Sequence, residues 1–240
     1  MKVSYPELVG SLTCPLRERF RRYDPHRPAE LTEKLRLVMD HYHYRIWDGK
    51  RPSFEWLRHR WQKEWFGEIK PSHIIFGEEA ELADEATQGI RILEGFYRLA
   101  NENPSIPLAI GWPYEIKLGT CTLTHRVDLV REVKIGRQKH VELVVYRFKE
   151  TLPDKWLLAH DLEVSLAAYA FRAAFEAKEA FISVWYLGRG KVLRTKREAP
   201  ELARAIKTAS RMAAALKDPY PSHGSWCGTC EYRNLCDEWR

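Results

Sequence analysis

Hydrophobic and polar positions along the chain follow two different periods. Helical spacing of apolar residues predicts helices over residues 31–65, 77–100, 161–177 and 200–216, and residues 48–53 interrupt the first of them. Shorter alternating or apolar runs predict strands over residues 107–116, 121–130, 141–148, 181–187 and 192–196, the last two forming a hairpin. This order of elements predicts an α/β or α+β core with helical additions.

Smaller signals refine these elements. Thr32 and Ser53 precede the two halves of the first helical segment and are expected to cap them. Four prolines within residues 1–30 argue against a long helix there and favour a short turn that carries Cys14. Cys121 opens a predicted strand, where a small buried residue is expected.

Length and composition limit the class of protein. The 240 residues suffice for one core, so we expect a single domain over residues 1–240, in which residues 31–100 form a helical insertion. No apolar run reaches about 18 residues, and the first residues lack the apolar stretch of a signal peptide. We therefore expect no membrane partner and a cytoplasmic location.

The net charge of +6 indicates an acidic partner. The basic residues gather in the segments 17–27, 45–63 and 189–197. Aromatic residues are interleaved with the first two segments: Phe20, Tyr23, Tyr44, Trp47, Trp56, Trp61 and Trp65. Cations for phosphates and rings for bases together suit single-stranded nucleic acid. The alternative is a solvated basic face over a tryptophan-rich core.

The end of the chain carries a C-x2-C-x5-C run made of Cys227, Cys230 and Cys236. Thiolates at this spacing are typical metal ligands, and five cysteines in a reducing compartment favour metal binding over disulfides. Three sulfurs leave one ligand position open. Either His223, which would give a local zinc site, or Cys14, which would join the two ends of the chain, can provide the fourth ligand.

The segment Ser11–Phe20 around Cys14, together with the cysteine run, resembles the iron–sulfur branch of the PD-(D/E)XK nucleases. That branch includes RecB-like CRISPR-associated exonucleases and AddB-type nucleases. The resemblance implies a central mixed sheet flanked by helices. It also implies a [4Fe-4S] cluster on Cys14, Cys227, Cys230 and Cys236, held where residues 1–30 and 217–240 meet as a clasp. Zinc is the alternative metal.

The same resemblance implies the positions of the nuclease residues. Glu115 matches the early acid, Asp128 the principal metal-binding aspartate, and Lys149 the catalytic lysine. Arg147 stands where the second metal-binding acid is expected, and it cannot coordinate a cation. Tyr169 matches the helical tyrosine of the family.

Two further helical positions are weaker candidates. The glutamine that usually precedes the family's tyrosine is Ser165 in this chain. His41 lies near the place of a metal-binding histidine, but residues two apart on a helix do not share a face, so His41 and His43 are not expected to form a metal pair.

Two interpretations of Arg147 follow. In the first, catalysis is impaired or lost, and Arg147 pairs with Asp128 as a fixed cation. In the second, the missing acid has migrated, so that the site binds Mg²⁺ or Mn²⁺. Asp161 and Glu163 are then the better candidates, ahead of Glu142 and Glu150.

The functional expectation is a nucleic-acid-binding protein of the nuclease fold with an impaired active site. It would act in DNA processing, with single-stranded DNA as the preferred partner, within a larger DNA-processing complex. The alternatives are an active metal-dependent nuclease and a zinc-stabilised RNA-binding or complex-assembly subunit. Because the chain lacks G-x4-G-K-[ST], any unwinding would come from another protein.

Overall fold

A computed structural model describes residues 1–23, 31–67, 78–102 and 104–236, and of residues 78–83 it gives the backbone alone. Three expectations extend beyond these residues. They are the part of the basic segment 17–27 after Tyr23, the helix start expected at residue 77, and the parts 24–30 and 237–240 of the expected clasp.

The strands are β1 (Lys2–Ser4), β2 (Pro107–Leu118), β3 (Cys121–Ile135), β4 (Gln138–Arg147), β5 (Phe181–Tyr186) and β6 (Lys191–Thr195). The α-helices are α1 (Tyr5–Gly10), α2 (Pro15–Arg22), α3 (Leu31–Trp47), α4 (Phe54–Phe66), α5 (Glu78–Glu102), α6 (Lys155–Ala159), α7 (Leu162–Phe175) and α8 (Ala199–Lys217). Short 3-10 helices cover Leu187–Arg189, Ser225–Thr229 and Arg233–Leu235.

The strands form one mixed sheet in the order β1-β3-β4-β5-β6, with β2 also paired to β3. β1 and β3 run parallel, as do β4 and β5, while the pairs of β2 with β3, β3 with β4 and β5 with β6 are antiparallel. The connection between the parallel strands β4 and β5 carries α6 and α7, as a parallel crossover requires.

Besides β2, two other strands pair with β3, each along a different part of it. β1 pairs with Thr122–Thr124, and β4 pairs with β3 only from Leu129 onward. Residues 125–127 of β3 therefore pair with β2 but with neither of the other two strands, and Asp128 follows them outside the register of all three pairings. Such a gap in a sheet exposes backbone and side-chain polar groups that another element has to satisfy.

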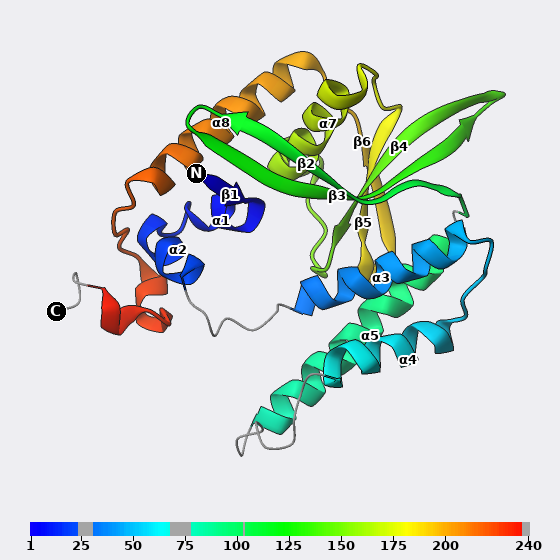
Figure 1. The fold of residues 1–240 in the computed structure, drawn as a ribbon, viewed down its shortest axis with the longest axis horizontal. Helices are drawn as coiled ribbons and strands as arrows, with labels where there is room; N and C mark the ends of the chain where they lie inside the picture. The colour runs from blue at the N-terminus through cyan, green and yellow to red at the C-terminus, as the bar shows by residue number, and fades with distance from the viewer. Residues whose placement is uncertain (24–30, 68–77, 103, 237–240) are drawn as a thin grey trace.

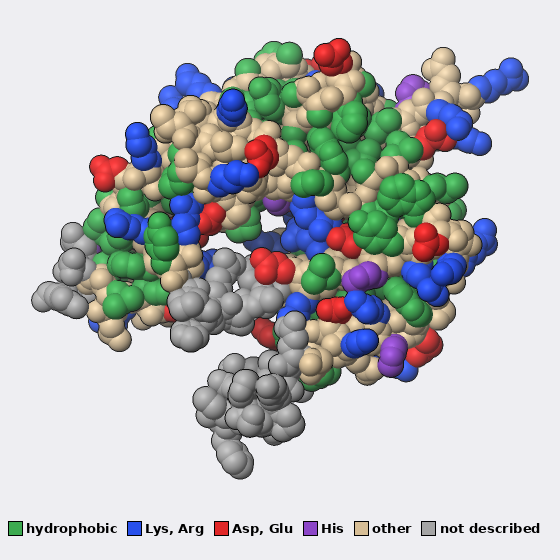
Figure 2. Space-filling model, viewed as in Figure 1, with side chains coloured by type: hydrophobic (Ala, Val, Ile, Leu, Met, Phe, Trp, Pro, Cys, Tyr) green, Lys and Arg blue, Asp and Glu red, His purple; other side chains and the backbone are tan. Residues whose placement is uncertain are grey.

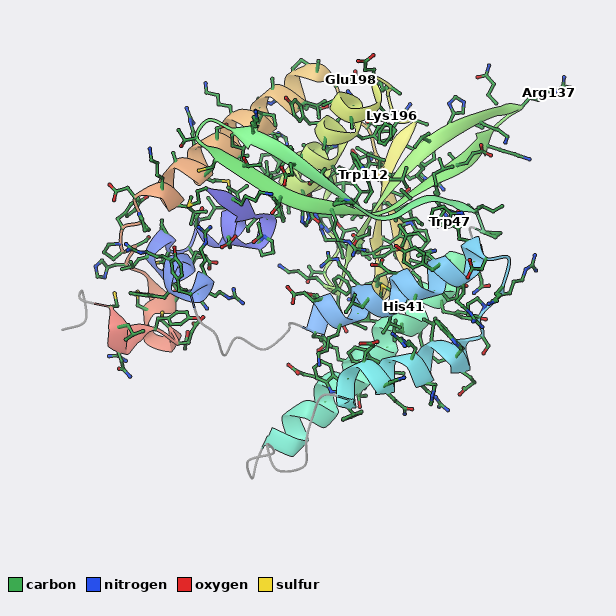
Figure 3. All side chains as sticks on the ribbon, in the orientation of Figure 1. His41, Trp47, Trp112, Arg137, Lys196 and Glu198 are labelled. Carbon is green, nitrogen blue, oxygen red and sulfur yellow. The ribbon has the colours of Figure 1, made fainter. Side chains whose placement is uncertain are left out.

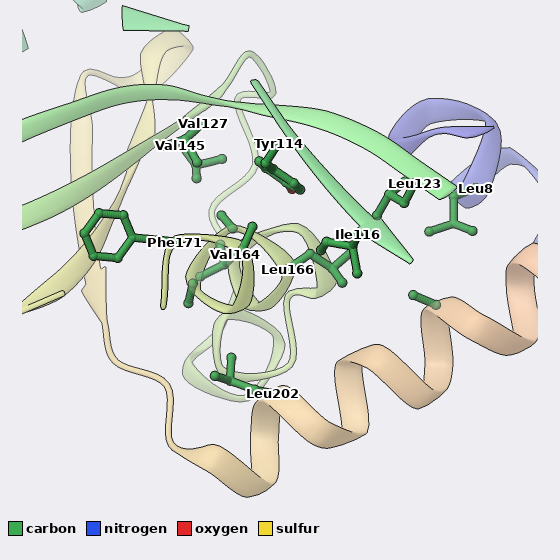
Figure 4. Close-up of a cluster of buried hydrophobic side chains, with 14 of the residues drawn as sticks. Leu8, Tyr114, Ile116, Leu123, Val127, Val145, Val164, Leu166, Phe171 and Leu202 are labelled. Carbon is green, nitrogen blue, oxygen red and sulfur yellow. The ribbon is translucent and has the colours of Figure 1, made fainter. Parts of the chain in front are cut away.

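Helices cover both faces of the sheet (Figure 1). α7 and α8 pack on one face around a core that includes Leu123, Val127 and Val145, part of which is drawn in Figure 4. α3, α4 and α5 cover the other face, where Val144 and Tyr146 belong to a second core. The alternation of Val144, Val145 and Tyr146 between the two cores follows from the two-residue period of a strand.

The predicted α/β architecture, a central mixed sheet flanked by helices, is confirmed. Ser53 caps α4 as expected, accepting a hydrogen bond from the Trp56 N–H. Thr32 lies inside α3 and not at its cap, so that prediction is wrong. β3 and β4 extend as a hairpin to a turn at Gly136, beyond the predicted strand ends. β1 and α6 were not predicted because segments of three and five residues carry little periodicity.

The two ends of the chain lie against each other. The Leu16 N–H of α2 donates to the Tyr220 carbonyl at 3.3 Å. Arg17 makes a forked ion pair with Glu231, with 2.9 Å between Nη2 and Oε2. The Phe20 and Tyr232 rings lie 5.8 Å apart. These contacts bring the segment with Cys14 to the cysteine run of the tail.

Candidate functional site

Asp128 lies in the gap of β3 and is almost fully buried, with 1% of its surface exposed. Its Oδ2 accepts a hydrogen bond from the Tyr146 N–H of β4 at 2.7 Å, so the carboxylate takes the place of a strand carbonyl. Its Oδ1 accepts a hydrogen bond from Arg36 Nε of α3 at 2.8 Å. Both carboxylate oxygens therefore already have partners, one of which is a fixed positive charge.

Arg126, two positions earlier on β3, makes a second ion pair with α3. Its Nη1 and Nη2 donate to the two carboxylate oxygens of Asp40 at 2.8 and 2.6 Å. Gly111 of β2 leaves room for this guanidinium: a Cβ there would lie 2.8 Å from its central carbon, and the glycine has φ +55. Burial raises the pKa of Asp40, which Arg126 only partly offsets.

Arg147 ends β4 and joins two acids at the start of α7. Its Nη2 lies 2.9 and 2.7 Å from the two carboxylate oxygens of Asp161, and its Nη1 donates to Glu163. Asp161 also caps α7 by accepting the Val164 N–H at 3.1 Å. The helix start therefore fixes both acids beside the arginine.

Glu163 also contacts β3. Its Oε1 lies 2.8 Å from His125 Nε2, and the His125 ring stacks on Tyr5 at 4.8 Å. Burial would raise the pKa of Glu163, but the Arg147 charge and the His125 hydrogen bond outweigh it and lower this pKa to about 2. Burial lowers the pKa of Arg147, but the negative charges of Glu163 and Asp161 outweigh burial and raise this pKa. Glu163 is therefore a carboxylate held ionised by an arginine.

The structure corrects the expected pairing of Arg147 with Asp128. Arg147 binds Asp161 and Glu163, whereas Asp128 binds Arg36. The reason is geometric: the Tyr146 N–H and Arg36 occupy the two oxygens of Asp128, while the start of α7 offers Arg147 two acids.

Four residues of the site were not predicted from the sequence: Arg36, Asp40, His125 and Arg126. Arg36 and Asp40 are four residues apart on α3, a spacing that places both on one helix face. Arg126 and Asp128 are two residues apart on β3, a spacing that places both on one face of the strand. These spacings were the available signals, but neither spacing identifies the partner.

The other candidate residues lie apart from these ion pairs. Glu115 is exposed and pairs with Lys2 at 2.7 Å. Lys149 is exposed and follows the end of β4, so strand alternation does not place it beside Arg147. Tyr169 is exposed on α7, and no hydrogen bond within the described part of the chain joins it to the site. His41 lies on α3, with its Nε2 3.4 Å from Arg60 Nη2 of α4, and Figure 3 shows it between α3 and α4.

Of the four acids considered as migrants, only Asp161 and Glu163 reach Arg147. Glu142 is buried further along β4, where it pairs with Arg131 at 2.7 Å and accepts a hydrogen bond from a serine of β5. Glu150 is exposed after the end of β4. The structure thus brings together Asp128, Arg147, Asp161 and Glu163, but not Glu115, Lys149 or Tyr169.

The four cysteines Cys14, Cys227, Cys230 and Cys236 line one small cavity between α2 and the tail, and His223 lines it too. Sulfur ligands of this number fit either a [4Fe-4S] cluster or a tetrahedral zinc ion. Among the described side chains, no three His, Cys, Asp or Glu residues are already gathered closely enough to hold a metal ion. Cys121 is buried at the start of β3 as predicted and is not among the described residues that line this cavity.

The carboxylates of the site do not fit a divalent cation in the observed arrangement. Mg²⁺ and Mn²⁺ take several oxygen ligands, and here arginine donors already bind Asp40, Asp128, Asp161 and Glu163. The space-filling view in Figure 2 shows basic side chains at the wall of the hollow in the middle of the molecule.

The predicted basic and aromatic segments divide between core and surface. Trp61 and Trp65 are buried, as the core interpretation expected. Tyr44 and Trp47 are about half exposed at the end of α3, with their rings stacked 6.3 Å apart. Arg197, counted with a basic surface segment, is fully buried and bonds Ser165 and the Leu158 carbonyl, so it does not belong to a solvated face.

A mixed sheet covered by helices on both faces, with Asp128 in a gap of β3, is consistent with a nuclease-like α/β fold. The sequence model described as the PD-(D/E)XK nuclease superfamily matches residues 3–237. The chain therefore belongs to this superfamily. No curated protein matches it.

None of the described helices is long and apolar enough to cross a membrane.

Proposed function

We propose that this protein binds nucleic acid through the nuclease fold and that its phosphodiester cleavage is impaired or lost. One observation carries the proposal: Arg36 and Arg147 form ion pairs with Asp128, Asp161 and Glu163, the acids that a catalytic metal would use. Membership in the superfamily supports nucleic-acid processing as its setting.

The charge balance explains the expected impairment. A divalent cation about 4 Å from a guanidinium is repelled by about 8 kcal/mol at an effective dielectric constant of about 20. Moving Arg147 away would relieve that repulsion, but it would leave Glu163, with a side chain only 8% exposed, without its cation. The fixed arginines and a bound metal are therefore alternatives at this site.

Nucleic-acid binding is supported by charge and by exposed rings. The net charge is +6, and the stacked pair Tyr44 and Trp47 offers a surface for bases. Figure 3 shows Trp47 at the end of α3 and Arg137 at the tip of the β3–β4 hairpin. Single-stranded DNA is the substrate class that uses both features.

The test is the cleavage of end-labelled single-stranded DNA by protein purified without oxygen, with Mg²⁺ or Mn²⁺ added. Asp128→Ala and Lys149→Ala are run beside the wild type. We expect no cleavage, and DNA binding that weakens with salt by about 0.7 logarithmic units per phosphate contact for each tenfold rise in salt. Cleavage by the wild type that Asp128→Ala abolishes would overturn the proposal.

Such cleavage would favour the second candidate, an active nuclease with a migrated acid. The observation in its favour is that Asp161 and Glu163 both lie at the arginine that replaces the missing acid. Arg147→Glu tests the position directly. If the site has merely lost its acid, calorimetry will show a gain in Mn²⁺ affinity, whereas no gain would show that the assignment of Arg147 to this position is wrong.

We further infer that Cys14, Cys227, Cys230 and Cys236 hold a [4Fe-4S] cluster that joins the ends of the chain. The shared cavity and the contacts between α2 and the tail support this assignment. The purified protein should be brown and contain iron and sulfide, and Cys14→Ser should bleach it.

His223 lines the same cavity, so the competing assignment is a zinc ion on His223 and the three tail cysteines. That arrangement would suit an RNA-binding or complex-assembly subunit. A colourless protein that contains zinc and keeps it in Cys14→Ser would support this alternative and exclude the cluster.

A further inference from the structure

An open cavity of about 720 Å³ lies on the α3–α5 side of the sheet, next to the Asp128 site. We call it the α3–α5 cavity. Tyr42 and His43 from α3, Tyr97 from α5, and Arg131 and Trp185 from the sheet line its walls, with Lys50 and Arg51 also in its lining. Ligand sites of drug-sized and cofactor-sized molecules have volumes of roughly 300–1,000 Å³.

The lining offers one partly buried aromatic ring, that of Tyr97, and one buried donor without an acceptor, while the Arg131 guanidinium lies over the Trp185 ring at 5.1 Å. Tyr42 and Tyr97 lie edge to face at 6.1 Å, and Trp185 is fully buried. The Trp185 Nε1–H has no hydrogen-bond acceptor within the described residues. A buried donor without an acceptor is unfavourable, so a ligand carbonyl or ring nitrogen that accepted this N–H would stabilise the protein.

The charges of the lining favour an anion. No Asp or Glu is among the described residues that line this cavity. Arg131 is buried and paired with Glu142 of β4, so this arginine is already neutralised. Lys50 and Arg51 are exposed, and no ion pair of theirs occurs in the described part of the chain. The positive charge available to a ligand therefore comes from these two residues.

His43 contributes a neutral ring. Its Nε2 lies 2.8 Å from the Tyr146 hydroxyl, and burial together with the Arg131 charge lowers its pKa to about 3. The inner wall is consequently uncharged and aromatic at His43, while the two cations without ion pairs are exposed.

We propose that the α3–α5 cavity is a nucleotide-binding site. The base would stack on Tyr97, the aromatic side chain of this lining that is only partly buried, and accept the Trp185 Nε1–H, and the phosphate would bind Lys50 and Arg51. Stacking of a base on an aromatic ring is favourable and tolerates any base, because every base has a flat face. The ligand class is a nucleoside 5′-monophosphate unit, either free or at the end of a strand.

This site is distinct from the Asp128 site, so the proposal does not rest on the proposed function. The two sites have different residues but adjoin each other: Asp40 is three residues before His43, about 4.5 Å along α3, and Tyr146 bonds Asp128 through its N–H and His43 through its hydroxyl. A nucleotide in the α3–α5 cavity would require no metal and no change in the arginine pairs.

Calorimetric titration with the four nucleoside 5′-monophosphates tests the proposal, with thymidine as the ligand that lacks a phosphate. We expect at least one monophosphate to bind. The double variant Lys50→Ala/Arg51→Ala should weaken its binding about tenfold and leave nucleoside binding unchanged. Trp185→Phe keeps an aromatic ring but removes the N–H, and should weaken both ligands about fivefold.

The matched control is Arg204→Ala/Lys207→Ala, which removes two exposed cations from α8 on the other face of the sheet. Thermal melts establish that each variant is folded. If Trp185→Phe does not fold, the exposed double variant still decides the question. Failure of all four monophosphates to bind, or equal binding by the Lys50→Ala/Arg51→Ala variant and the wild type, would overturn the proposal.

A 5′-phosphorylated oligothymidylate distinguishes the two sources of the nucleotide. Competition between this strand and the monophosphate, lost in Lys50→Ala/Arg51→Ala, would assign the site to the end of a strand. Binding of the monophosphate without such competition would assign it to a free nucleotide.

Discussion

Replacing Arg147 by methionine tests the central feature of the site. Methionine keeps the unbranched apolar stem of the arginine side chain but lacks the guanidinium. The change therefore removes the only arginine bonded to Asp161 and Glu163 in the described structure. The side chains of these acids are 18% and 8% exposed, so water replaces little of the lost interaction. Removing one partner of such a buried pair costs about 3–5 kcal/mol, which we expect as the loss in unfolding free energy at pH 7.

The pH dependence makes this prediction specific. In the wild type the pKa of Glu163 is about 2, below its unfolded value of about 4.3, so its ionisation stabilises the protein at neutral pH by on the order of 3 kcal/mol. That stability is present above pH 4.3 and is lost as the pH falls toward 2. In Arg147→Met the burial remains without the cation, which raises the pKa of Glu163. Protonation of Glu163 then removes the buried, unpaired charge of the variant. The difference in unfolding free energy between the variant and the wild type should therefore shrink between pH 7 and pH 5.

Urea denaturation at pH 7, 6 and 5 measures both effects. The control is Lys178→Met, which breaks the exposed ion pair with Glu198 and should leave the unfolding free energy close to that of the wild type. If Arg147→Met lies within 1 kcal/mol of the wild type at pH 7, or its deficit does not change with pH, the reasoning about this ion pair is wrong.

Three further predictions concern other parts of the fold. The pKa of His43 is about 3, below the unfolded value of about 6.5, so stability should fall as the pH drops through this window, by up to about 1.4 kcal/mol per pH unit. His43→Gln should flatten this slope between pH 6.5 and 5 in urea denaturation, and an unchanged slope would contradict the assignment. Gly111→Ala should destabilise by more than about 1 kcal/mol, because it combines a positive φ with a clash against Arg126. Gly119→Ala, which has a similar φ but open space, is the control and should cost less. Trp47→Ala should weaken single-stranded DNA binding by about 1–3 kcal/mol without changing its salt dependence, and an unaltered affinity would remove Trp47 from the binding surface.

The sequence by itself determined most of the secondary structure. Periodicity located α3, α4, α7, α8 and the five longer strands, because a residue's burial repeats every two or 3.6 positions along a regular element. The resemblance to the PD-(D/E)XK nucleases, and not periodicity, pointed to Asp128, Arg147, Asp161 and Glu163 as members of one site. The spacing of the cysteines selected Cys227, Cys230 and Cys236, and the resemblance added Cys14; all four line one cavity, together with His223.

Only the tertiary structure decided which charges pair. Arg36 and Asp128 are 92 residues apart, and no local pattern distinguishes that pair from Arg147 with Asp128. The choice depends on the gap in β3, where the Tyr146 N–H and α3 reach Asp128, and on the start of α7, which presents two acids to Arg147. The α3–α5 cavity likewise joins residues from four elements and two connections. Periodicity reports which side of an element is buried, whereas the partners and cavities follow from how separate elements pack.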